Sequence, residues 1–349
     1  MRYAILGMLA ALVLMAGMPS WFMGAPQEMS GDSLQSPTDG SRSELRDTAP
    51  SDETQKQPAE SAETAPSDPT PHVPKETTVK LLRHETGAVE SIDLEEYLCG
   101  VVFGEMPASF GLESLRAQAV AARTYTMYQI KHDTVHENAD LCDDSACCQC
   151  YLPYDVAVST WSESLVQSSW ELIRQAVNDT AGQILTSNGE PIAALYHAAS
   201  YGMTEAPSYV WGGELPCLVS VESPEEDILS TVEVSADRLG SVLTDGGYTM
   251  SGSPDTWLGE TTLTPSGRVK AVSICGQSVS GVWLRSRLAL KSAMYSVRLQ
   301  NGTFVFTVHG SGHGVGMSQY GAKAYAEQGW SYDRILAHYY PNVTLDVIR

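Results

Sequence analysis

Basic side chains are scarce in this sequence. Of its 349 residues, 21 are Lys or Arg and 42 are Asp or Glu, which gives a formal net charge of −21 at pH 7. A nucleic-acid-binding surface needs clusters of Lys and Arg to face the phosphate backbone, and docking on anionic lipid also needs a basic surface. The composition therefore argues against nucleic acid as a partner. The sequence also has no internal repeat.

Large apolar side chains are scarce in one segment of the chain. Residues 25–76 contain almost no aromatic or large apolar side chains and are rich in Ser, Thr, Pro, Glu and Asp. Such a segment cannot bury enough apolar surface to offset the entropy lost on ordering. With 11 acidic and 4 basic residues, it is predicted to be a disordered tether extended by its own charge.

The N-terminus lacks charge. Residues 3–23 form a run of 21 uncharged residues after Arg2, about the length of a helix that crosses a bilayer. The basic end is expected to stay in the cytoplasm, so the rest of the chain would be exported. A cleaved signal peptide is the alternative, but Pro19, Trp21 and Phe22 crowd the position where a cleavage site needs small residues. We therefore expect residues 1–24 to be an uncleaved transmembrane anchor of a single-pass cell-membrane protein.

The remaining residues, 77–349, mix helix and strand patterns without regular alternation. This favours an α+β class, with helices and antiparallel strands forming one exported domain with a substrate groove. Turns are expected at Asn188-Gly189, Ser266-Gly267 and Asn301-Gly302. The predicted helices cover residues 94–102, 112–131, 170–181, 235–243, 317–328 and 332–339, and the predicted strands lie within 77–82, 89–92, 183–199, 258–279 and 296–309.

Glu105 stands at the end of the first predicted helix. It follows an apolar run and precedes Pro107, which must end or bend the helix. A carboxylate at such a break, beside Met106 and Phe110, can be partly desolvated. Desolvation raises the pKa of a carboxyl group and makes it a plausible general acid near neutral pH. The alternative is a solvent-exposed Glu at a helix end, which the spacing alone favours.

Several blocks of this sequence resemble the stage II sporulation protein D (SpoIID) family. They cover about residues 77–349 in the family's order, and an anchor followed by an exported domain is also similar to this family. The blocks are EMPASF at 105–110, ESLRAQAVAARTY at 113–125, SGR at 266–268, the Leu-Arg pattern at 284–292, GHGVGMSQYGA at 312–322 and ILAHYYP at 335–341.

The resemblance implies a peptidoglycan lytic transglycosylase. Such an enzyme cleaves the bond between N-acetylmuramic acid and N-acetylglucosamine and leaves a 1,6-anhydro end. The match gives Glu105 the catalytic role: it protonates the glycosidic oxygen and then, as a carboxylate, takes the proton from the sugar's own C6 hydroxyl. Because that hydroxyl replaces water as the nucleophile, one carboxylate suffices, whereas a hydrolase needs two.

The family's setting implies the partners. Its members act in sporulation, where peptidoglycan between the mother cell and the forespore is degraded during engulfment. Relatives work with the stage II sporulation proteins P, an amidase, and M, a membrane protein. Because the enzyme follows the amidase, the preferred substrate would be glycan strands stripped of their stem peptides.

Several side chains are expected to line a substrate groove. Arg123, in the helix after Glu105, could contact the sugar, orient the acid or form a surface ion pair. A polar stretch leads to Trp211, and polar groups beside an aromatic ring suit a sugar site, although Trp211 could equally be core. His313 either lines the groove or is satisfied structurally between close-packed glycines. The predicted substrate-binding residues are Gln118, Arg123, His197, Tyr201, Thr204, His313 and Gln319.

Four of the seven cysteines lie within nine positions. One imidazole and three thiolates suit tetrahedral zinc, and some family members carry zinc here on two Cys and two His; Cys147 stands where one His would be. Disulfides are the alternative in an exported domain, although adjacent cysteines rarely pair, and Cys150 could replace a ligand. The predicted ligands of a structural zinc are His136, Cys142, Cys147 and Cys148, and the cysteines expected in the core are Cys99, Cys217 and Cys275.

Two other functions stay open. The same family includes amidase enhancers, which bind and stimulate a wall amidase, so the chain could be a non-enzymatic module. It could also bind glycan and release nothing. An intact Glu105 favours the enzyme. A Ser-His-Asp hydrolase is disfavoured because no segment resembles a nucleophile elbow.

Overall fold

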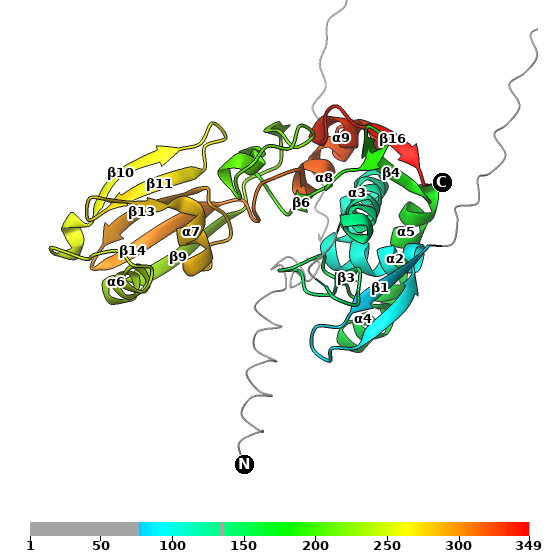
Figure 1. Ribbon diagram of the computed structural model, residues 1–349, viewed down its shortest axis with the longest axis horizontal. Coiled ribbons are helices and arrows are strands. Elements are labelled where there is room, and N and C mark those ends of the chain that lie inside the picture. Colours follow the sequence, from blue (N-terminus) through cyan, green and yellow to red (C-terminus); the bar gives the residue numbers. More distant parts are fainter. Residues whose placement is uncertain (1–76, 133–135, 349) are drawn as a thin grey trace, which may run out of the picture. The chain divides into compact units, whose positions relative to one another are not determined.

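The computed structural model describes residues 77–132 and 136–348, and they form an α+β arrangement (Figure 1). The strands in these residues form six small sheets. Most strand pairs are antiparallel, whereas β1–β3 and β15–β6 are parallel. The α+β class is thus confirmed. The predicted anchor (1–24) and tether (25–76) lie outside the described residues, and among the helices that are described none has the length and apolarity needed to cross a membrane.

The first hydrophobic core forms around α2. This helix begins after Asp93, whose side chain accepts hydrogen bonds from the amides of Glu95 and Glu96, and it ends before Pro107 because proline cannot continue it. Side chains such as Leu98 are fully buried in this core. The elements here are β1 (Thr78–Leu82), β2 (Val89–Asp93), α2 (Leu94–Glu105), η2 (Ala108–Phe110), α3 (Leu112–His132), β3 (Leu141–Cys142), α4 (Tyr154–Thr160) and α5 (Glu163–Asp179).

Helix α3 is shared between two cores. Leu115 and Ala119 belong to the first core, whereas Ala117, Val120 and Ala121 belong to a second. Small apolar residues on both faces let neighbouring elements approach closely on either side. The elements between α5 and β9 and those after β14 are β4 (Gln183–Ser187), β5 (Glu190–Pro191), β6 (Tyr196–His197), β7 (Gly202–Met203), η3 (Pro207–Tyr209), β8 (Glu222–Ser223), β15 (Met317–Ser318), α8 (Gln319–Glu327), α9 (Tyr332–Tyr339) and β16 (Thr344–Val347).

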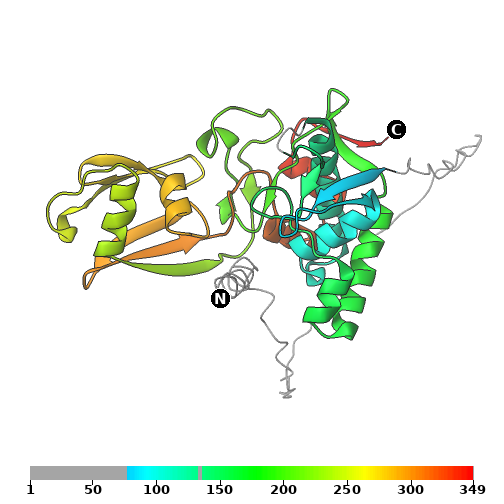
Figure 2. The same cartoon turned by 60° about the horizontal axis from the view of Figure 1, so that its bottom comes forward.

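Residues 229–309 contain a third core of their own (yellow-green to orange in Figures 1 and 2). Two three-stranded antiparallel sheets, β10-β11-β12 and β13-β14-β9, supply buried residues such as Phe304 and Phe306. From β14 the chain enters the loop 310–316, which carries His313 and leads to β15. The elements are β9 (Leu229–Ser235), α6 (Ala236–Asp245), η4 (Pro254–Thr256), β10 (Leu258–Leu263), β11 (Val269–Ile274), β12 (Gln277–Ser280), α7 (Gly281–Arg287), β13 (Tyr295–Gln300) and β14 (Thr303–His309).

The predicted hairpin turns are confirmed, and one helix start is wrong. Asn188 and Asn301 both have the positive φ that an Asn-Gly hairpin turn requires. Helix α5 begins at Glu163 rather than at 170. The prediction misses its first two turns because they are mostly exposed, with only Val166 buried, and so show no apolar period. Helices α4 and α7 are not predicted, since two turns are too short to establish an apolar period.

Candidate active site and metal centre

Glu105 is the last residue of α2, and two segments distant in sequence hold its carboxylate. Oε1 accepts a hydrogen bond from the backbone amide of Cys150 at 2.8 Å, and Oε2 accepts one from Nε2 of Gln319 at 3.3 Å. The side chain remains partly exposed, so a substrate can reach it. No hydrogen bond or ion pair joins Glu105 to a second acid among residues 77–132 and 136–348. Glu105 is therefore an oriented carboxyl group that a substrate can reach.

Two glycines on α2 let the loop after β3 approach this carboxylate. Gly100 and Gly104 are one helical turn apart and so lie on one face of the helix. A Cβ at Gly100 would lie 2.4 Å from the ring of Tyr151, and a Cβ at Gly104 would lie 2.9 Å from Sγ of Cys150. Larger residues at either position would push the loop away, and the amide of Cys150 would then lose its bond to Glu105.

The buried side chain of Gln149 orients the hydroxyl of Tyr196 beside the acid. Nε2 of Gln149 donates to Oγ1 of Thr126 at 3.0 Å and to the hydroxyl of Tyr97 at 3.3 Å. Its Oε1 is therefore left to accept from the Tyr196 hydroxyl, at 2.8 Å. The same hydroxyl also hydrogen-bonds to Glu105. Because a hydroxyl has one proton, Tyr196 can donate to Gln149 or to the ionised carboxylate of Glu105, but not to both at once.

The predicted residues Gln118 and Gln319 lie next to the acid. Gln319 is the first residue of α8, and its Nε2 lies 3.3 Å from Oε2 of Glu105 and 3.5 Å from Oε1 of Gln118. Gln118 comes from α3 and is fully buried, and its own Nε2 has no hydrogen-bond partner in the described part of the chain. The structure thus brings three predicted site residues together from α2, α3 and α8.

Burial raises the pKa of Glu105 above the ordinary carboxyl value, although hydrogen bonds from Cys150, Gln319 and Tyr196 act in the opposite direction. The residue also sits at the C-terminal end of α2, where the helix dipole disfavours negative charge. A carboxyl group with a raised pKa keeps its proton closer to neutral pH and can act as a general acid. The surroundings of Glu105 therefore favour the desolvated carboxyl group over the solvent-exposed alternative.

Arg123 is fully buried, and the protein alone satisfies its guanidinium. It forms two hydrogen bonds with the carboxylate of Glu95, at 3.0 and 2.5 Å, and donates to the carbonyls of Val177 and Gln183, both at 3.2 Å. No surface of this side chain is left for a sugar. Of the three roles that the sequence leaves open, the structure supports an ion pair, but a buried one that ties α2, α3, α5 and β4 together.

Of the three residues predicted in the loop that begins at β6, only Tyr201 is exposed. Nδ1 of the buried His197 donates to the carbonyl of Val315 at 3.1 Å, and its Nε2 accepts from Oγ of Ser200 at 2.6 Å. Burial and nearby positive charges hold the pKa of His197 well below its usual value, so this ring is neutral. Thr204 is buried and bonded to the backbone, whereas the side chain of Tyr201 is 43% exposed.

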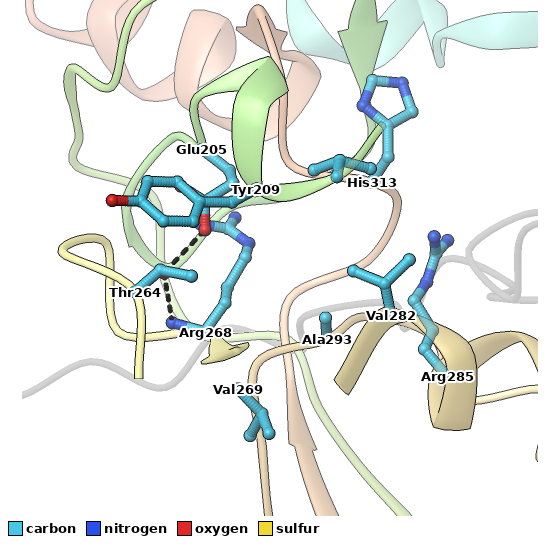
Figure 3. Close-up of a pocket in the computed structure, with 10 residues that line it drawn as sticks. Glu205, Tyr209, Thr264, Arg268, Val269, Val282, Arg285, Ala293 and His313 are labelled. Carbon is cyan, nitrogen blue, oxygen red and sulfur yellow. Dashed lines mark hydrogen bonds between the residues drawn. The ribbon is translucent and has the colours of Figure 1, made fainter. Parts of the chain in front are cut away.

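A small cleft beside His313 is lined by side chains from five segments (Figure 3). Oε2 of Glu205 accepts from the hydroxyl of Thr264 at 2.6 Å, and the amide of Arg268 donates to the same hydroxyl at 3.2 Å. The guanidinium of Arg268 donates to the carbonyl of Met203 at 2.9 Å. These bonds join the turn at 264–268 to residues 203–205. The lining includes Glu205, Tyr209, Thr264, Arg268, Arg285 and His313.

His313 lines this cleft and is also hydrogen-bonded to the backbone. Its Nδ1 accepts from the amide of Val315 at 3.0 Å, and the ring also bonds to the backbone of Tyr196. Burial, with a contribution from the charge of Arg285, lowers the pKa of His313 to about 4. The ring is therefore neutral at neutral pH. Both interpretations that the sequence leaves open apply to this residue, since it borders the cleft and its nitrogen atoms are engaged structurally.

Trp211, for which the sequence leaves core and groove open, is 57% exposed. Its ring centroid lies 5.0 Å from that of His313. A large aromatic ring that stays in solvent beside a polar cleft can pack on the face of a sugar. The structure therefore favours the groove for Trp211.

The four predicted metal ligands His136, Cys142, Cys147 and Cys148 meet in space, with their ligand atoms all within 4.8 Å of one another. Nε2 of His136 lies 3.3 Å from Sγ of Cys148 and 3.6 Å from Sγ of Cys147, and these two sulfurs are 3.9 Å apart. Tetrahedral zinc, with Zn–S bonds of about 2.3 Å and Zn–N bonds of about 2.0 Å, places its ligand atoms about 3.5–3.8 Å apart. The donor set therefore fits zinc, and Cys150 is not part of it.

The other cysteines divide between core and surface. All seven lie in the described residues, and none of them forms a disulfide. Cys99 and Cys217 are buried, as the sequence predicts. Cys275 is only partly buried and sits in a turn with a φ of 50°, so its assignment to the core holds in part.

Sequence reasoning misses four contributors to this region: the amide of Cys150, the side chains of Gln149 and Tyr196, and Arg285 in the cleft. The first acts through its backbone, which no side-chain pattern reveals. The pair of glycines one turn apart in α2 is the one signal in the sequence that a segment packs closely against that face. Arg285 is part of a block that resembles the family, but the sequence assigns it no role.

This constellation, a lone carboxyl group beside a His/Cys cluster in an α+β domain, lies in a segment that a family model recognises. The model described as "Stage II sporulation protein" matches residues 82–187, which contain Glu105 and the metal cluster. The chain is 36% identical over 274 residues to stage II sporulation protein D of Bacillus amyloliquefaciens, covering 77% of this chain and 78% of the relative. It is 35% identical over 270 residues to stage II sporulation protein D of Bacillus subtilis (strain 168), covering 75% and 77%.

A third relative has a different name. The chain is 30% identical over 307 residues to the amidase enhancer of Bacillus subtilis (strain 168), covering 71% of this chain and 40% of the relative. The chain thus belongs to the stage II sporulation protein D family and is related to the amidase enhancer.

Proposed function

We propose that this chain is a peptidoglycan lytic transglycosylase of sporulation, with Glu105 as its general acid and base. The observation that carries the proposal is the accessible carboxyl group of Glu105, with a raised pKa, held by the amide of Cys150 and by Gln319. Hydrolysis of a glycosidic bond needs a second carboxylate at a defined separation. That the nucleophile is instead the sugar's own C6 hydroxyl is what the resemblance to the family implies.

In this reaction the carboxyl group of Glu105 first donates a proton and then accepts one. Protonated Glu105 donates to the glycosidic oxygen while the C1–O bond breaks through an oxocarbenium-like transition state. The resulting carboxylate takes the proton of the C6 hydroxyl, whose oxygen attacks C1 and closes the 1,6-anhydro ring. Glu105 ends protonated, as it began. The donors from Cys150 and Gln319 stabilise the carboxylate that exists between the two transfers.

Product analysis of the Glu105→Gln variant tests this function. The wild type should release 1,6-anhydro ends from peptide-stripped glycan strands, and the variant should lose about 10²–10⁴ of the rate, the usual contribution of general acid–base catalysis. Glu260→Gln, an exposed change of the same kind on β10, is the matched control. Full activity of Glu105→Gln would contradict the role of this residue, and reducing ends in place of anhydro ends would contradict the transglycosylase.

A structural zinc belongs to the proposal. His136, Cys142, Cys147 and Cys148 would hold it, and the bound ion would supply a rigid cross-link in the loop rather than a group that reacts. The loop continues directly into Cys150, whose amide bonds to Glu105. The fit of the donor set and its distances support this assignment. Metal analysis of the purified chain should give one zinc per chain.

The second candidate is an amidase enhancer without enzymatic activity, and the similarity to the relative of that name favours it. The two functions separate when glycan is incubated with this chain alone and together with a wall amidase. A transglycosylase releases anhydro products from stripped strands by itself. An enhancer releases nothing alone and raises the rate of peptide removal when the amidase is present.

We also propose the cellular location and the partners, on the basis of the family and of the N-terminal sequence. Residues 1–24 would anchor the chain in the membrane, and residues 25–76 would tether the remaining domain outside the cytoplasm, between mother cell and forespore. The partners would be the stage II sporulation proteins P and M. Protease accessibility of intact sporulating cells and co-purification with either protein test these assignments.

A further inference from the structure

Arg285 is a cation without a counter-charge in the cleft of Figure 3. It lies near the end of α7 and is partly exposed, and within the described part of the chain its buried Nε has no hydrogen-bond partner. Across residues 77–132 and 136–348, no hydrogen bond or ion pair reaches its guanidinium, and burial lowers its pKa. Even partial burial of a charge without a partner has a cost. That cost is recovered when a ligand brings the missing negative charge.

The other charged groups of the cleft do not compensate Arg285. Glu205 accepts three hydrogen bonds from the protein, and its charge acts, together with that of Glu225, on Arg268, the second guanidinium of the cleft. His313 is neutral. The cleft therefore keeps a positive charge at Arg285 in a chain whose net charge is −21. An anion is the ligand that these charges select.

We propose that Arg285 binds the lactyl carboxylate of an N-acetylmuramic acid residue in a peptide-stripped glycan strand. This inference rests on the proposed function, because only then is the ligand a glycan. While the stem peptide is attached, an amide blocks the lactyl group and no charge is present. Removal of the peptide uncovers a carboxylate, and a guanidinium presents paired N–H donors that match a carboxylate in geometry and charge.

The position of the cleft suits a sugar that flanks the scissile bond. The ring of His313 bonds to the backbone of Tyr196, and the hydroxyl of Tyr196 bonds to Glu105, so one residue links the cleft to the acid. Trp211 lies beside His313 with its ring exposed. A strand that crosses Glu105 extends over several sugars, and a flanking sugar can pack on Trp211 while its lactyl group reaches Arg285.

The consequence is a physical basis for substrate choice. The cleft would recognise the charge that an amidase leaves behind, rather than only the absence of a bulky peptide. A strand whose lactyl groups are small but neutral would then be a poor substrate, and this distinguishes charge recognition from simple steric exclusion.

Two chemically matched substrates test the inference with the full chain. One is amidase-stripped glycan, and the other is the same glycan with its lactyl carboxylates converted to primary amides. The wild type should lose about 10- to 100-fold in kcat/KM on the amidated strands, the range expected for one hydrogen-bonded charge contact. The loss should fall on KM, because the carboxylate does not react and is bound equally in the ground and transition states.

Arg285→Gln should show the same loss on stripped strands and no further loss on amidated strands. Arg287→Gln, an exposed change on the same helix, should behave as the wild type. Wild-type activity on amidated strands that equals its activity on stripped strands overturns the inference. A loss by Arg285→Gln that is equal on both substrates also overturns it, because that pattern indicates a structural role.

Binding measured in the Glu105→Gln background separates this inference from the proposed function. The Kd for stripped strands should be about 10- to 100-fold lower than the Kd for amidated strands, and the additional Arg285→Gln change should remove the difference. If the Glu105→Gln chain binds stripped strands selectively but the wild type releases no anhydro product, the charge contact stands and the transglycosylase is refuted. Anhydro products without selective binding would do the reverse.

Discussion

Replacing Gln319 by Leu tests whether this side-chain amide affects the pKa of Glu105 or only contacts the substrate. Nε2 of Gln319 donates to Oε2 of Glu105 at 3.3 Å, and the residue is only 5% exposed. Leu has a similar size and lacks the donor, so most of the packing is retained. A hydrogen bond to a charged group contributes about 1.5–3 kcal/mol. Because 3.3 Å is long for an N–H···O bond, we take about 1.5 kcal/mol, which corresponds to about one pH unit.

The sign follows from which form of Glu105 accepts the bond. Losing the donor destabilises the carboxylate, so the change adds to the burial that already raises the pKa of Glu105. The acid must be protonated to donate, and activity is therefore present below its pKa and lost as the pH rises through it. In Gln319→Leu the alkaline limb of the kcat/KM profile, which reports the free enzyme, should move up by about one pH unit.

The assay is release of 1,6-anhydro ends from stripped glycan across the acidic and neutral pH range. Gln300→Leu, at the exposed end of β13, is the matched control and should leave the profile in place. A substrate contact alone would raise KM without moving the limb. An unmoved limb in Gln319→Leu would refute the reasoning that this side chain sets the pKa of the acid.

Four further predictions follow from the site and its supports. Glu105→Gln should raise Tm at neutral pH but not below about pH 4, the ordinary carboxyl range. The reason is that a carboxyl group with a raised pKa contributes stability that is lost as the pH rises through that pKa. Thermal unfolding at both pH values checks this. Cys148→Ser should lose zinc and about 10- to 100-fold in activity, and metal analysis alongside product release would show whether the two losses occur together. Arg123→Gln should lower the free energy of unfolding by about 3–5 kcal/mol. Arg116→Gln, at a more exposed ion pair, should lower it by about 1 kcal/mol or less. Urea unfolding of the two variants compares these losses. Trp211→Ala should raise KM about three- to tenfold with kcat unchanged, and a fall in kcat alone would exclude a sugar-packing role.

Local patterns predict much of this fold because they act over a few residues. The stripe that includes Leu115 and Ala119 predicts α3, and it does face a core. Pro107 fixes the end of α2, and Asn-Gly pairs fix two hairpin turns. The His/Cys cluster is also predictable, since three of its members lie within seven positions of one loop. In each case the physical cause lies within the segment whose structure it determines.

Arg123 shows where such reasoning ends. It stands in a block that resembles the family, eighteen residues after the acid, and those facts suggest a role at the sugar. Its guanidinium is instead satisfied by Glu95 on α2 and by carbonyls at the end of α5 and in β4. Whether a charged side chain is buried depends on which elements surround it, and those elements are set by tertiary packing. The same holds for Arg285, which has no hydrogen-bond or ion-pair partner among the residues that the structure describes, and this is visible only in three dimensions.

The surroundings of Glu105 depend on a loop more than on the helix that carries it. Within four consecutive residues, Cys147 and Cys148 contribute thiols to the metal cluster, Gln149 orients Tyr196, and Cys150 donates to the acid. Two peptide bonds separate Cys148 from Cys150, so the cluster and the amide that holds the carboxylate lie close together along the chain. The helix supplies only the position of Glu105 and the glycines that admit the loop. The cysteine cluster and Glu105, which the sequence presents as separate features, are therefore joined by one short loop, whose amide at Cys150 holds the carboxylate.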